Sequence, residues 1–595
     1  MNLAAIQHYS FDNFCYALND DELVISILTG KDVDRVFIVS GDPFEAGIMG
    51  GNWQWHGTEK EITAKKELQN HFRWTTMLRP EFKRLSYYFR ILSGTEERFF
   101  TYNGFFTKEE FENGGSRHGK FIMPWMNSAD TNRTPAWAEN AVWYQIFPSR
   151  FARGKSDFTP QNLIPWQKYG ESIPFSKNHR EPVYGGNIQG IIDHLDYLKE
   201  LGITGIYTTP LNKASSQHKY DTTDYMEIDE EFGTKETMRR FVQEAHARGI
   251  SVMLDGVFNH SGWFFEKWQD VWKNRENSAY KDWFMVNDFN FTEPAHGHGQ
   301  GNAGTGKYYS FAFTDFMPKL NTNNKEVRDY IISACRSWVQ DYDIDGLRLD
   351  VANEISHVFC QELRAAMKAL KPEFYIIGEI WHNSMPWLRG TEYDSVMNYP
   401  LQNSIADFCA QDKQCVKDFE FAVNRCYSMY YEQTNRVLFN QMDSHDTIRI
   451  LNRCGKNKTR ARQALTLLFA MPGSVCIYYG TEIMLEGGYD PDNRRCMPWN
   501  EIEAGMFKDD FAFMQTLIAL RKEQGALRST DYEFIYDKDD AYGKSRILRI
   551  AKHAEGETII VLLNCGTFPD DFATDEAAAA QILLRSPGIL VYKTQ

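Results

Sequence analysis

Apolar and polar positions follow three different rhythms along the chain. Over about residues 1–125, short runs such as "DELVISILTG" and "LSYYFRILSG" alternate apolar and polar residues between Gly, Asp and Asn turns. Over residues 126–526, short apolar runs alternate with helical patterns, and over residues 527–595 short strand-like runs such as "TIIVLLNCG" return. These rhythms predict an N-terminal β-sandwich, a central α/β domain and a small C-terminal β domain.

Eight apolar runs in the central region have the length of strands, and helical patterns separate them. In order they are "AVWYQIFPSRF", "ITGIYTTPL", "ISVMLDGVFNH", "IDGLRLDVANE", "FYIIGEIWH", "DSVMNYPL", "RVLFNQMDSHD" and "GSVCIYYGTE". Eight such repeats predict a parallel (β/α)₈ (TIM) barrel. The alternative is an open doubly wound sheet, but no glycine-rich phosphate turn follows the first strand.

A long excursion rich in Trp, Gly and Asn, residues 260–321, interrupts the repeats after the third strand. Loops of this length in a compact domain are usually functional, so we expect this one over the barrel mouth. The tryptophans of "WFFEKWQDVW" within it could be packing residues or platforms for sugar rings. The segment "GNAGTGKYY" resembles a phosphate loop but has Tyr308 where Ser or Thr is needed. His296 and His298 have no further metal ligand nearby in the sequence.

Composition and charge narrow the function. The 595 residues carry a net charge of −15, which argues against a nucleic-acid partner. The first residues, "MNLAAIQHYSFDNF", lack a basic stretch followed by an apolar core, and no run of 18 apolar residues occurs. We therefore expect no signal peptide and no membrane segment. The ten cysteines form no CxxC pair, which is typical of free thiols in a reducing compartment, and we expect the cytoplasm.

Polar residues close four of the predicted strands, and active sites of (β/α)₈ barrels lie at these ends. The third strand ends with Asp255, Asn259 and His260, the fourth with Arg348 and Asp350, the fifth with Glu379, and the seventh with His445 and Asp446. One polar strand end could be a satisfied core group. Four ends that all carry carboxylates predict a catalytic site.

Arg348 and Asp350 are two residues apart on one strand, so they share a face, while Leu347, Leu349 and Val351 point to the other. The pair could be a structural ion pair or part of the chemistry. Retaining glycosidases use two carboxyl groups about 5–5.5 Å apart, one a nucleophile and one a proton donor. A nearby cation keeps a carboxylate ionised. We interpret Arg348 as holding Asp350 charged.

Four strand-end motifs identify a resemblance. "LDGVFNH", "GLRLDVANE", "IIGEIWH" and "FNQMDSHD" resemble, in order, those of glycoside hydrolase family 13, the α-amylase family. "MPKLN", "VANE", "YGGNIQGI", "HKYDTTDY", "SMPWLRG" and "GGYDPDNRRCM" resemble its subgroup of neopullulanases, cyclomaltodextrinases and maltogenic amylases. The resemblance covers residues 142–499. The N-terminal region is similar, more loosely, to a family 34 carbohydrate-binding module.

The resemblance implies roles for the strand-end residues. Asp350 would be the nucleophile, Glu379 the general acid/base and Asp446 the transition-state stabiliser. Substrate-binding residues would be Tyr220, His260, Arg348, Trp381 and His445. Asp255 would hold Arg348 in place, and Asn259 would support the strand end.

The resemblance also implies the substrates. We expect a retaining hydrolase of α-1,4 bonds in cyclodextrins and maltooligosaccharides, with pullulan and starch as further substrates and some transglycosylation. The family expectation is a homodimer in which one N-terminal domain covers the partner's site. One alternative is a general α-amylase or oligo-α-glucosidase. Another is a non-catalytic carbohydrate-binding protein, which the three carboxylates disfavour.

Calcium is the metal that this family can bind. Relatives often carry "NGDPSND" after the first strand, but this chain has "RGKSDFTPQN", in which Arg153 and Lys155 bring positive charge. Asn259 matches a calcium ligand of many α-amylases, although relatives in this subgroup commonly lack that site. We predict that no metal or other cofactor is required.

Overall fold

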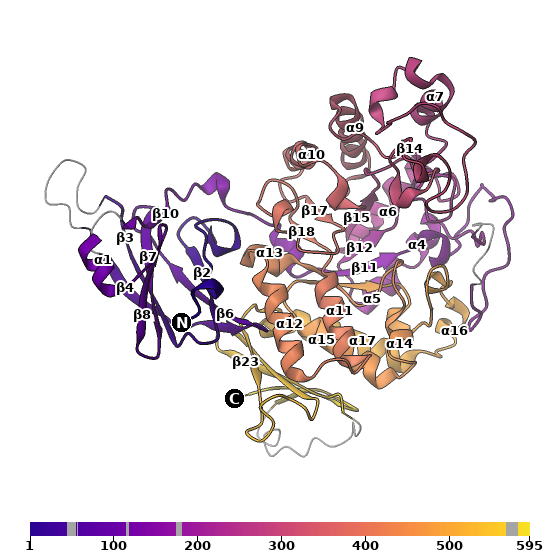
Figure 1. Ribbon diagram of the computed structural model, residues 1–595. Coiled ribbons are helices and arrows are strands. Elements are labelled where there is room, and N and C mark those ends of the chain that lie inside the picture. The colour runs from indigo at the N-terminus through magenta and orange to yellow at the C-terminus, as the bar shows by residue number, and fades with distance from the viewer. Residues whose placement is uncertain (45–54, 56, 115–117, 174–180, 567–580, 595) are drawn as a thin grey trace. The chain divides into compact units, whose positions relative to one another are not determined.

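The computed structural model describes residues 1–44, 55, 57–114, 118–173, 181–566 and 581–594 (Figure 1). Its contacts divide the chain into two units. The first holds Met1–Arg133, Leu388–Gly390 and Gln414–Asn435. The second holds Thr134–Trp387, Thr391–Lys413 and Arg436–Gln595.

The first unit contains two antiparallel sheets that share one core. One sheet has the order β1 (Cys15–Ala17), β2 (Leu23–Gly30), β6 (His71–Leu78), β5 (Lys65–Glu67). The other has the order β4 (Thr58–Ile62), β3 (Arg35–Gly41), β7 (Leu85–Ser93), β8 (Glu96–Thr101), β9 (Gly104–Phe106), and β10 (Phe121–Met123) also pairs with β7. Ile25 and Ile27 from the first sheet pack with Ile38 and Phe89 from the second. The predicted N-terminal β-sandwich is confirmed.

A distant helix completes this unit. Helix α12 (Val416–Ser428) lies far along the chain, yet Asn424 donates to the carbonyl of Glu67 (2.8 Å). The side chain of Asn13 donates to the carbonyl of Ser428 (2.8 Å). Local periodicity marks such a segment as a helix but contains no information about its partner.

The second unit is built on a parallel barrel. Its strands follow the order β18 (Ser395–Val396), β17 (Tyr375–Gly378), β16 (Gly346–Leu349), β15 (Ser251–Gly256), β12 (Gly205–Thr208), β11 (Val142–Ile146), β20 (Ser474–Tyr478), β19 (Phe439–Gln441). A parallel bridge between Met397 and Phe439 joins the two ends of this order. The barrel is therefore nearly closed, as the eight strand–helix repeats predicted.

Helices surround these strands (Figure 1). They include α4 (Ile188–Asp193), α5 (Leu195–Leu201), α6 (Lys235–Ala247), α9 (Lys325–Tyr342), α10 (His357–Leu370), α11 (Tyr399–Cys409), α15 (Lys458–Ala470) and α17 (Lys508–Glu523). Asparagine and threonine start several of them: Asn324 accepts from the N–H of Glu326 at α9, and Thr234 accepts from the N–H of Thr237 at α6. These caps satisfy backbone donors that the first turn leaves free.

Large apolar side chains fill the lower barrel interior. Trp143, Tyr207, Met253, Tyr375 and Phe439 point inward from five strands and are fully buried. The rings of Trp143 and Tyr375 stack at 5.9 Å. Because this layer fills the interior of the barrel, the polar strand ends above it line a site that is closed at its base, not an open channel.

The "YGGNIQG" motif is explained by close backbone approach. A Cβ atom at Gly190 would lie 2.1 Å from the carbonyl oxygen of Ala152, and one at Gly186 would lie 2.2 Å from that of Pro148. Between them, Asn187 accepts from the N–H of Gly154 (3.0 Å) and from the N–H of Gly190 (2.8 Å), which caps α4. The motif therefore fastens the loop that follows β11.

The excursion of residues 260–321 is a folded element with helix α7 (Glu266–Asn274), the short α8 (Gly301–Gly304) and its own core. Trp268 is fully buried and packs on Phe284 (4.9 Å) and Tyr308 (4.8 Å). Trp272 stacks on Phe291 (5.2 Å). Of the two roles left open for these tryptophans, packing is the one the structure shows. Lys307, the lysine of the segment that resembles a phosphate loop, donates to the backbone carbonyl of Asn290.

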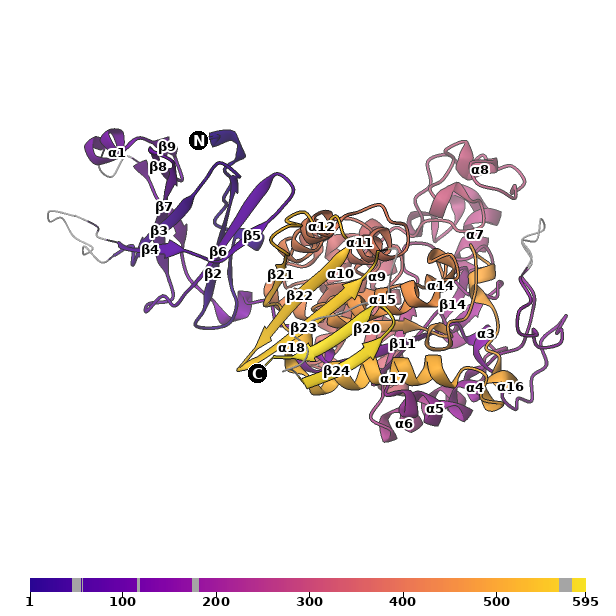
Figure 2. The same cartoon turned by 90° about the horizontal axis from the view of Figure 1, so that it is seen from below.

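An antiparallel sheet follows the barrel, in the order β21 (Tyr532–Ile535), β22 (Ile547–Ala554), β23 (Glu557–Asn564), β25 (Ile589–Lys593), β24 (Gln581–Ser586). Figure 2 shows it as one layer in front of α11 and α15. Gln463 on α15 ties it to the barrel by donating to the carbonyls of Asn564 (2.7 Å) and Gly588 (3.1 Å). The predicted C-terminal β domain is confirmed.

No helix among the residues that the structure describes has the length and apolar character needed to cross a membrane.

Candidate active site

Arg348 lies at the centre of the strand-end cluster, at the end of β16, and is fully buried. Its Nη1 donates to both oxygens of Asp255 (2.9 and 3.0 Å) and to Asp350 (3.0 Å). Its Nη2 forms an ion pair with Glu379 (3.1 Å). A guanidinium has five N–H donors in a plane, so one arginine can hold three carboxylates. Arg348 therefore joins the ends of β15, β16 and β17.

The turn after Asp350 differs from the expected strand. The strand ends at Leu349, and Val351 has φ 44° and ψ 47°, the left-handed region that β-branched residues rarely adopt. Leu347 and Leu349 are buried on the far face as predicted, but Val351 does not join them. Instead its N–H donates to Glu379 (3.0 Å). The strained turn thus points a backbone donor at a predicted catalytic residue.

Glu379 follows β17 and is held from three sides. Besides Arg348 and the N–H of Val351, the indole N–H of Trp381 donates to its other oxygen (2.9 Å). Trp381 itself stacks on Tyr399 at 3.6 Å and leaves 49% of its surface exposed. The arrangement fixes the carboxyl group of Glu379 and presents an aromatic surface beside it.

Asp255 is fully buried and does not face solvent. Besides Arg348, its carboxylate accepts from the hydroxyls of Tyr207 (2.6 Å) and Tyr220 (2.8 Å). Burial raises the pKa of Asp255, while Arg348 and the tyrosine hydrogen bonds oppose this rise. Asp255 thus contacts Arg348 directly, and its role in holding that arginine stays a prediction.

His445 and Asp446 form the opposite wall. The imidazole Nε2 of His445 lies 2.6 Å from the hydroxyl of Tyr220 and 3.2 Å from Asp446. The rings of Tyr220 and His445 stack at 5.2 Å. Burial lowers the pKa of His445 well below its usual range, and the charges of Arg494 and Arg348 lower it further. Burial and both arginines therefore favour the neutral imidazole.

Arg494 also contacts the site, although no sequence pattern points to it beyond the motif "GGYDPDNRRCM" in which it lies. It donates to the carbonyl of His445 (3.0 Å) and lies 3.9 Å from Asp446. Glu181 and Asp490 pair with its Nη1, both at 2.9 Å. Its partner Glu181 lies 313 positions away, so no spacing rule could have linked them.

The carboxyl groups differ in exposure and share a surplus of negative charge. Side-chain exposure is 10% for Asp350 and 32% for Asp446. Burial raises the pKa of Asp350 well above its usual range; Arg348 opposes this, while Glu379, Asp255 and Asp446 add to it. Burial, helped by Glu379, raises the pKa of Asp446 to about 7. Arg348 therefore acts on the pKa of Asp350 in the predicted direction, but burial, together with the neighbouring carboxyls, outweighs it.

His260 is positioned beside the site and fully buried. Its Nε2 donates to the carbonyl of Tyr220 (3.1 Å), and its Nδ1 lies 3.3 Å from the amide nitrogen of Asn259. The ring stacks on Phe311 at 5.1 Å. Burial lowers the pKa of His260 to about 3. Both ring nitrogens already have protein partners, so a sugar hydroxyl would have to share them.

Protein cations occupy the oxygens that could have served a calcium ion. The side-chain oxygen of Asn259 accepts from the ammonium of Lys319, which also pairs with Glu354 (3.0 Å). Arg153 donates to the carbonyls of Tyr184 (3.1 Å) and Ile164 (3.0 Å). These donor sets do not fit calcium, because each already binds a positive group.

Within the described part of the chain, no group of three or more His, Cys, Asp or Glu side chains is arranged to hold a metal ion.

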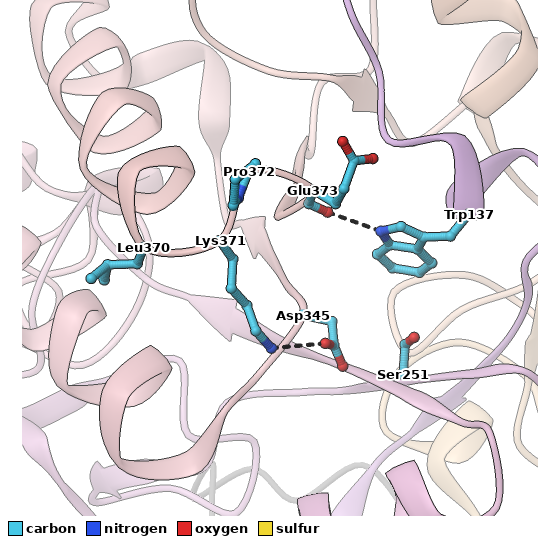
Figure 3. A pocket seen from close by; sticks show the side chains of 7 residues that line it. All are labelled: Trp137, Ser251, Asp345, Leu370, Lys371, Pro372 and Glu373. Carbon is cyan, nitrogen blue, oxygen red and sulfur yellow. Dashed lines mark hydrogen bonds and ion pairs between the residues drawn. The ribbon is translucent and has the colours of Figure 1, made fainter.

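A cavity of about 430 Å³ lies at the other end of the barrel, at the starts of β15 and β16 (Figure 3). Trp137, Ser251, Asp345, Lys371 and Glu373 line it. Lys371 pairs with Asp345 (3.0 Å), and the indole of Trp137 donates to the carbonyl of Glu373 (2.9 Å). This cavity lies at the ends of the strands opposite to those that carry Asp350, Glu379 and Asp446.

Comparisons with known proteins agree with this geometry. Residues 145–530 match the alpha amylase catalytic domain, and residues 1–127 match the alpha amylase N-terminal ig-like domain. The chain is 42% identical to a maltogenic alpha-amylase of Bacillus acidopullulyticus, over 94% of this chain and 91% of that protein. It is 40% identical to an intracellular maltogenic amylase of Bacillus subtilis, over 92% and 90%. A solved cyclomaltodextrinase structure superposes with a TM-score of 0.87 at 35% identity, over 100% of this chain and 98% of that one.

Proposed function

The chain belongs to the α-amylase family, glycoside hydrolase family 13. We propose that it cleaves α-1,4-glucosidic bonds by double displacement, and that Asp350, Glu379 and Asp446 carry out this reaction. It is a hydrolase of α-glucans, like its relatives. The observation that carries the proposed roles is the single buried guanidinium shared by Asp350 (3.0 Å) and Glu379 (3.1 Å). One guanidinium can span two carboxyl groups only when they are close, as the about 5–5.5 Å separation of a retaining enzyme requires.

In the first step, Asp350 attacks the anomeric carbon while Glu379 gives its proton to the departing glucosidic oxygen. The products are a covalent glucosyl-Asp350 ester and a free sugar end. In the second step, Glu379 takes a proton from water, and the water oxygen displaces Asp350 from the anomeric carbon. A sugar hydroxyl in place of water gives transglycosylation. Two inversions restore the α-anomer.

Asp446 is proposed to stabilise the sugar as positive charge develops at its ring. Its carboxyl group is more open than the other two and lies 3.2 Å from His445 and 3.9 Å from Arg494. These neighbours fix its position, and a carboxylate there would accept from two adjacent sugar hydroxyls. Such contacts accelerate the reaction only where they strengthen in the transition state.

The substrates we propose are cyclodextrins and maltooligosaccharides. The first test compares initial rates on β-cyclodextrin and on soluble starch with one enzyme preparation. We expect the higher rate on the cyclodextrin. A higher rate on starch would instead favour the alternative, a general α-amylase on the same machinery. ¹H NMR of the first product formed checks the mechanism, because double displacement releases the α-anomer and single displacement the β-anomer.

We further propose that the enzyme works as a cytoplasmic homodimer without a bound metal. The location is supported by similarity to the intracellular maltogenic amylase of Bacillus subtilis, and the dimer by the family resemblance alone. Light scattering should give twice the mass of one chain. Lys319 and Arg153 donate to the oxygens that a calcium ion would need, which supports activity without a metal. Activity should therefore survive dialysis against a chelator.

A further inference from the structure

Gln145 is a buried amide below the site that no sequence motif had pointed to. It lies on β11, two residues after Trp143, so its side chain points into the barrel one layer above the apolar floor. It is fully buried and has no access to substrate. Its amide nitrogen lies 2.8 Å from Nδ1 of His445, on the opposite side of the ring from the site.

The direction of each hydrogen bond around His445 follows from counting donors. The hydroxyl of Tyr220 lies 2.8 Å from Asp255 and 2.6 Å from Nε2 of His445, but it has one hydrogen to give. Both oxygens of Asp255 accept from Arg348, so this carboxylate has no hydrogen to offer. Tyr220 therefore donates to Asp255, and His445 must donate from Nε2 to the tyrosine oxygen.

Asp446 supports the same assignment. Its carboxylate oxygen lies 3.2 Å from Nε2 of His445, where a lone pair on the nitrogen would repel it and an N–H attracts it. With the hydrogen on Nε2, a neutral imidazole has only a lone pair at Nδ1, and that lone pair needs a donor. The amide N–H of Gln145 is the group placed to supply it.

The reverse orientation of the amide fails on charge. If the oxygen of Gln145 faced Nδ1, that nitrogen would also need a hydrogen, and the ring would become a buried cation. Arg348 and Arg494 lie close enough to oppose this, and burial lowers the pKa of His445 further. A neutral ring with hydrogen on Nε2 gives each hydrogen bond of His445, to Gln145 and to Tyr220, one donor and one acceptor.

We infer that Gln145 is a positioning residue that locks His445 in the Nε2–H tautomer. Through this lock it keeps an N–H aimed at Tyr220 and Asp446 and keeps the tyrosine hydroxyl on Asp255. A second residue that fixes the tautomer of a histidine is a known requirement of histidine-dependent sites. The inference deepens the proposed function, because it assigns what orients the wall of the sugar site.

The test reads the tautomer directly. ¹⁵N NMR of histidine-labelled, substrate-free enzyme distinguishes protonated from bare ring nitrogens, and the spectrum of His445→Asn identifies the resonances of His445. We expect hydrogen on Nε2 in the wild type. In Gln145→Glu the carboxylate can only accept, so the hydrogen should move to Nδ1 or a second one should be added there.

Steady-state kinetics then measure how much the hydrogen bond from Gln145 to His445 contributes to catalysis. We expect kcat/KM of Gln145→Glu to fall about 10- to 100-fold, mainly through kcat. Gln463→Glu is the matched control, since it also places a carboxylate at a buried amide, but on α15 against the C-terminal sheet. It should lower thermal stability and leave kcat/KM unchanged. Gln145→Met, which neither donates nor accepts, should give a smaller loss and a mixture of tautomers.

Two outcomes overturn the inference: hydrogen on Nδ1 in the wild type, or an unchanged Nε2–H signal in both Gln145 variants. The wild-type spectrum and Gln145→Met decide the matter even if Gln145→Glu does not fold. Because the tautomer is read without substrate or turnover, its result is independent of the proposed function. That function fails separately if an Asp350→Asn variant keeps its activity.

Discussion

Two aspartates at the two ends of β16 have opposite electrostatics. Asp345 precedes the strand and Asp350 follows it. Asp345 accepts from His246 (2.7 Å), from the N–H of Val252 (2.8 Å) and from Lys371 (3.0 Å). Although burial alone would raise the pKa of Asp345, these donors lower it. Burial and neighbouring carboxyls raise the pKa of Asp350.

Burial is the largest cause of the raised pKa of Asp350, and the balance of charge around each carboxyl adds to the difference. At the start of the strand, His246 and Lys371 face Asp343 and Asp345, two potential cations for two anions. At its end three carboxyls contact Arg348: Asp255, Asp350 and Glu379. Asp446 adds a fourth negative charge beside Asp350, with Arg494 3.9 Å from it. Where cations and carboxylates are equal in number, the carboxylates stay ionised. Where carboxyls outnumber cations, their mutual repulsion favours a proton shared among them. The same residue type is therefore structural at one end and chemical at the other.

The largest effect should come from neutralising the aspartate at the chemical end. Asp350→Asn removes the proposed nucleophile, so kcat/KM on β-cyclodextrin should fall by at least about a thousandfold. Equilibrium binding of a maltooligosaccharide, measured by calorimetry, should persist. Turnover close to the wild-type value in carefully purified Asp350→Asn would remove Asp350 from the mechanism.

Arg348→Lys should cost about a hundredfold in kcat/KM, because an ammonium cannot bind three carboxylates with fixed geometry. Arg348 favours the ionised form of Asp350, so weakening it raises the pKa of that carboxyl further. The acid limb of the pH profile of kcat/KM should therefore move to higher pH. Lys371→Met, at the other end of the strand, is the control. A profile that moves to lower pH, or moves equally in both variants, contradicts the charge-balance explanation.

Asp345→Asn should change stability and leave the chemistry alone. It removes the charge that His246 and Lys371 share, and losing a charged hydrogen-bond partner costs about 1–3 kcal/mol. Urea unfolding measures the loss. The value of kcat should stay at the wild-type level once the variant is folded, and a fall in kcat comparable to that of Asp350→Asn would show that the two ends are not separate.

The smallest expected effect concerns His246. Its hydrogen bond to Asp345 raises its pKa, with a contribution from Asp343, while burial and Lys371 oppose the rise. Stability from a raised histidine pKa is fully present below the unfolded value of about 6.5 and is lost as pH rises through the folded value.

His246→Gln should therefore cost more at about pH 5.5 than at about pH 9, by less than about 1 kcal/mol for a pair this exposed. Urea unfolding at the two pH values gives the comparison. An equal cost at both would mean that the histidine contributes only packing.

The sequence alone determined the barrel and the identity of the strand-end carboxylates. Apolar runs of strand length, separated by segments with helical periodicity, are local patterns that are visible in the sequence itself. Asp255, Arg348, Asp350, Glu379 and Asp446 follow from where those runs end. Their convergence is then a property of any parallel barrel.

Only the tertiary structure decided which groups touch and in which direction their pKa values move. Gln145 meets His445 across 300 positions. Residues 414–435 join the first unit rather than the barrel that surrounds them in sequence. Val351 leaves the strand that its apolar neighbours predicted. Each of these contacts depends on the distance between segments that are far apart in the sequence. A pKa shift depends on burial and on the charges within a few ångströms. The spacing of residues along the chain determines neither.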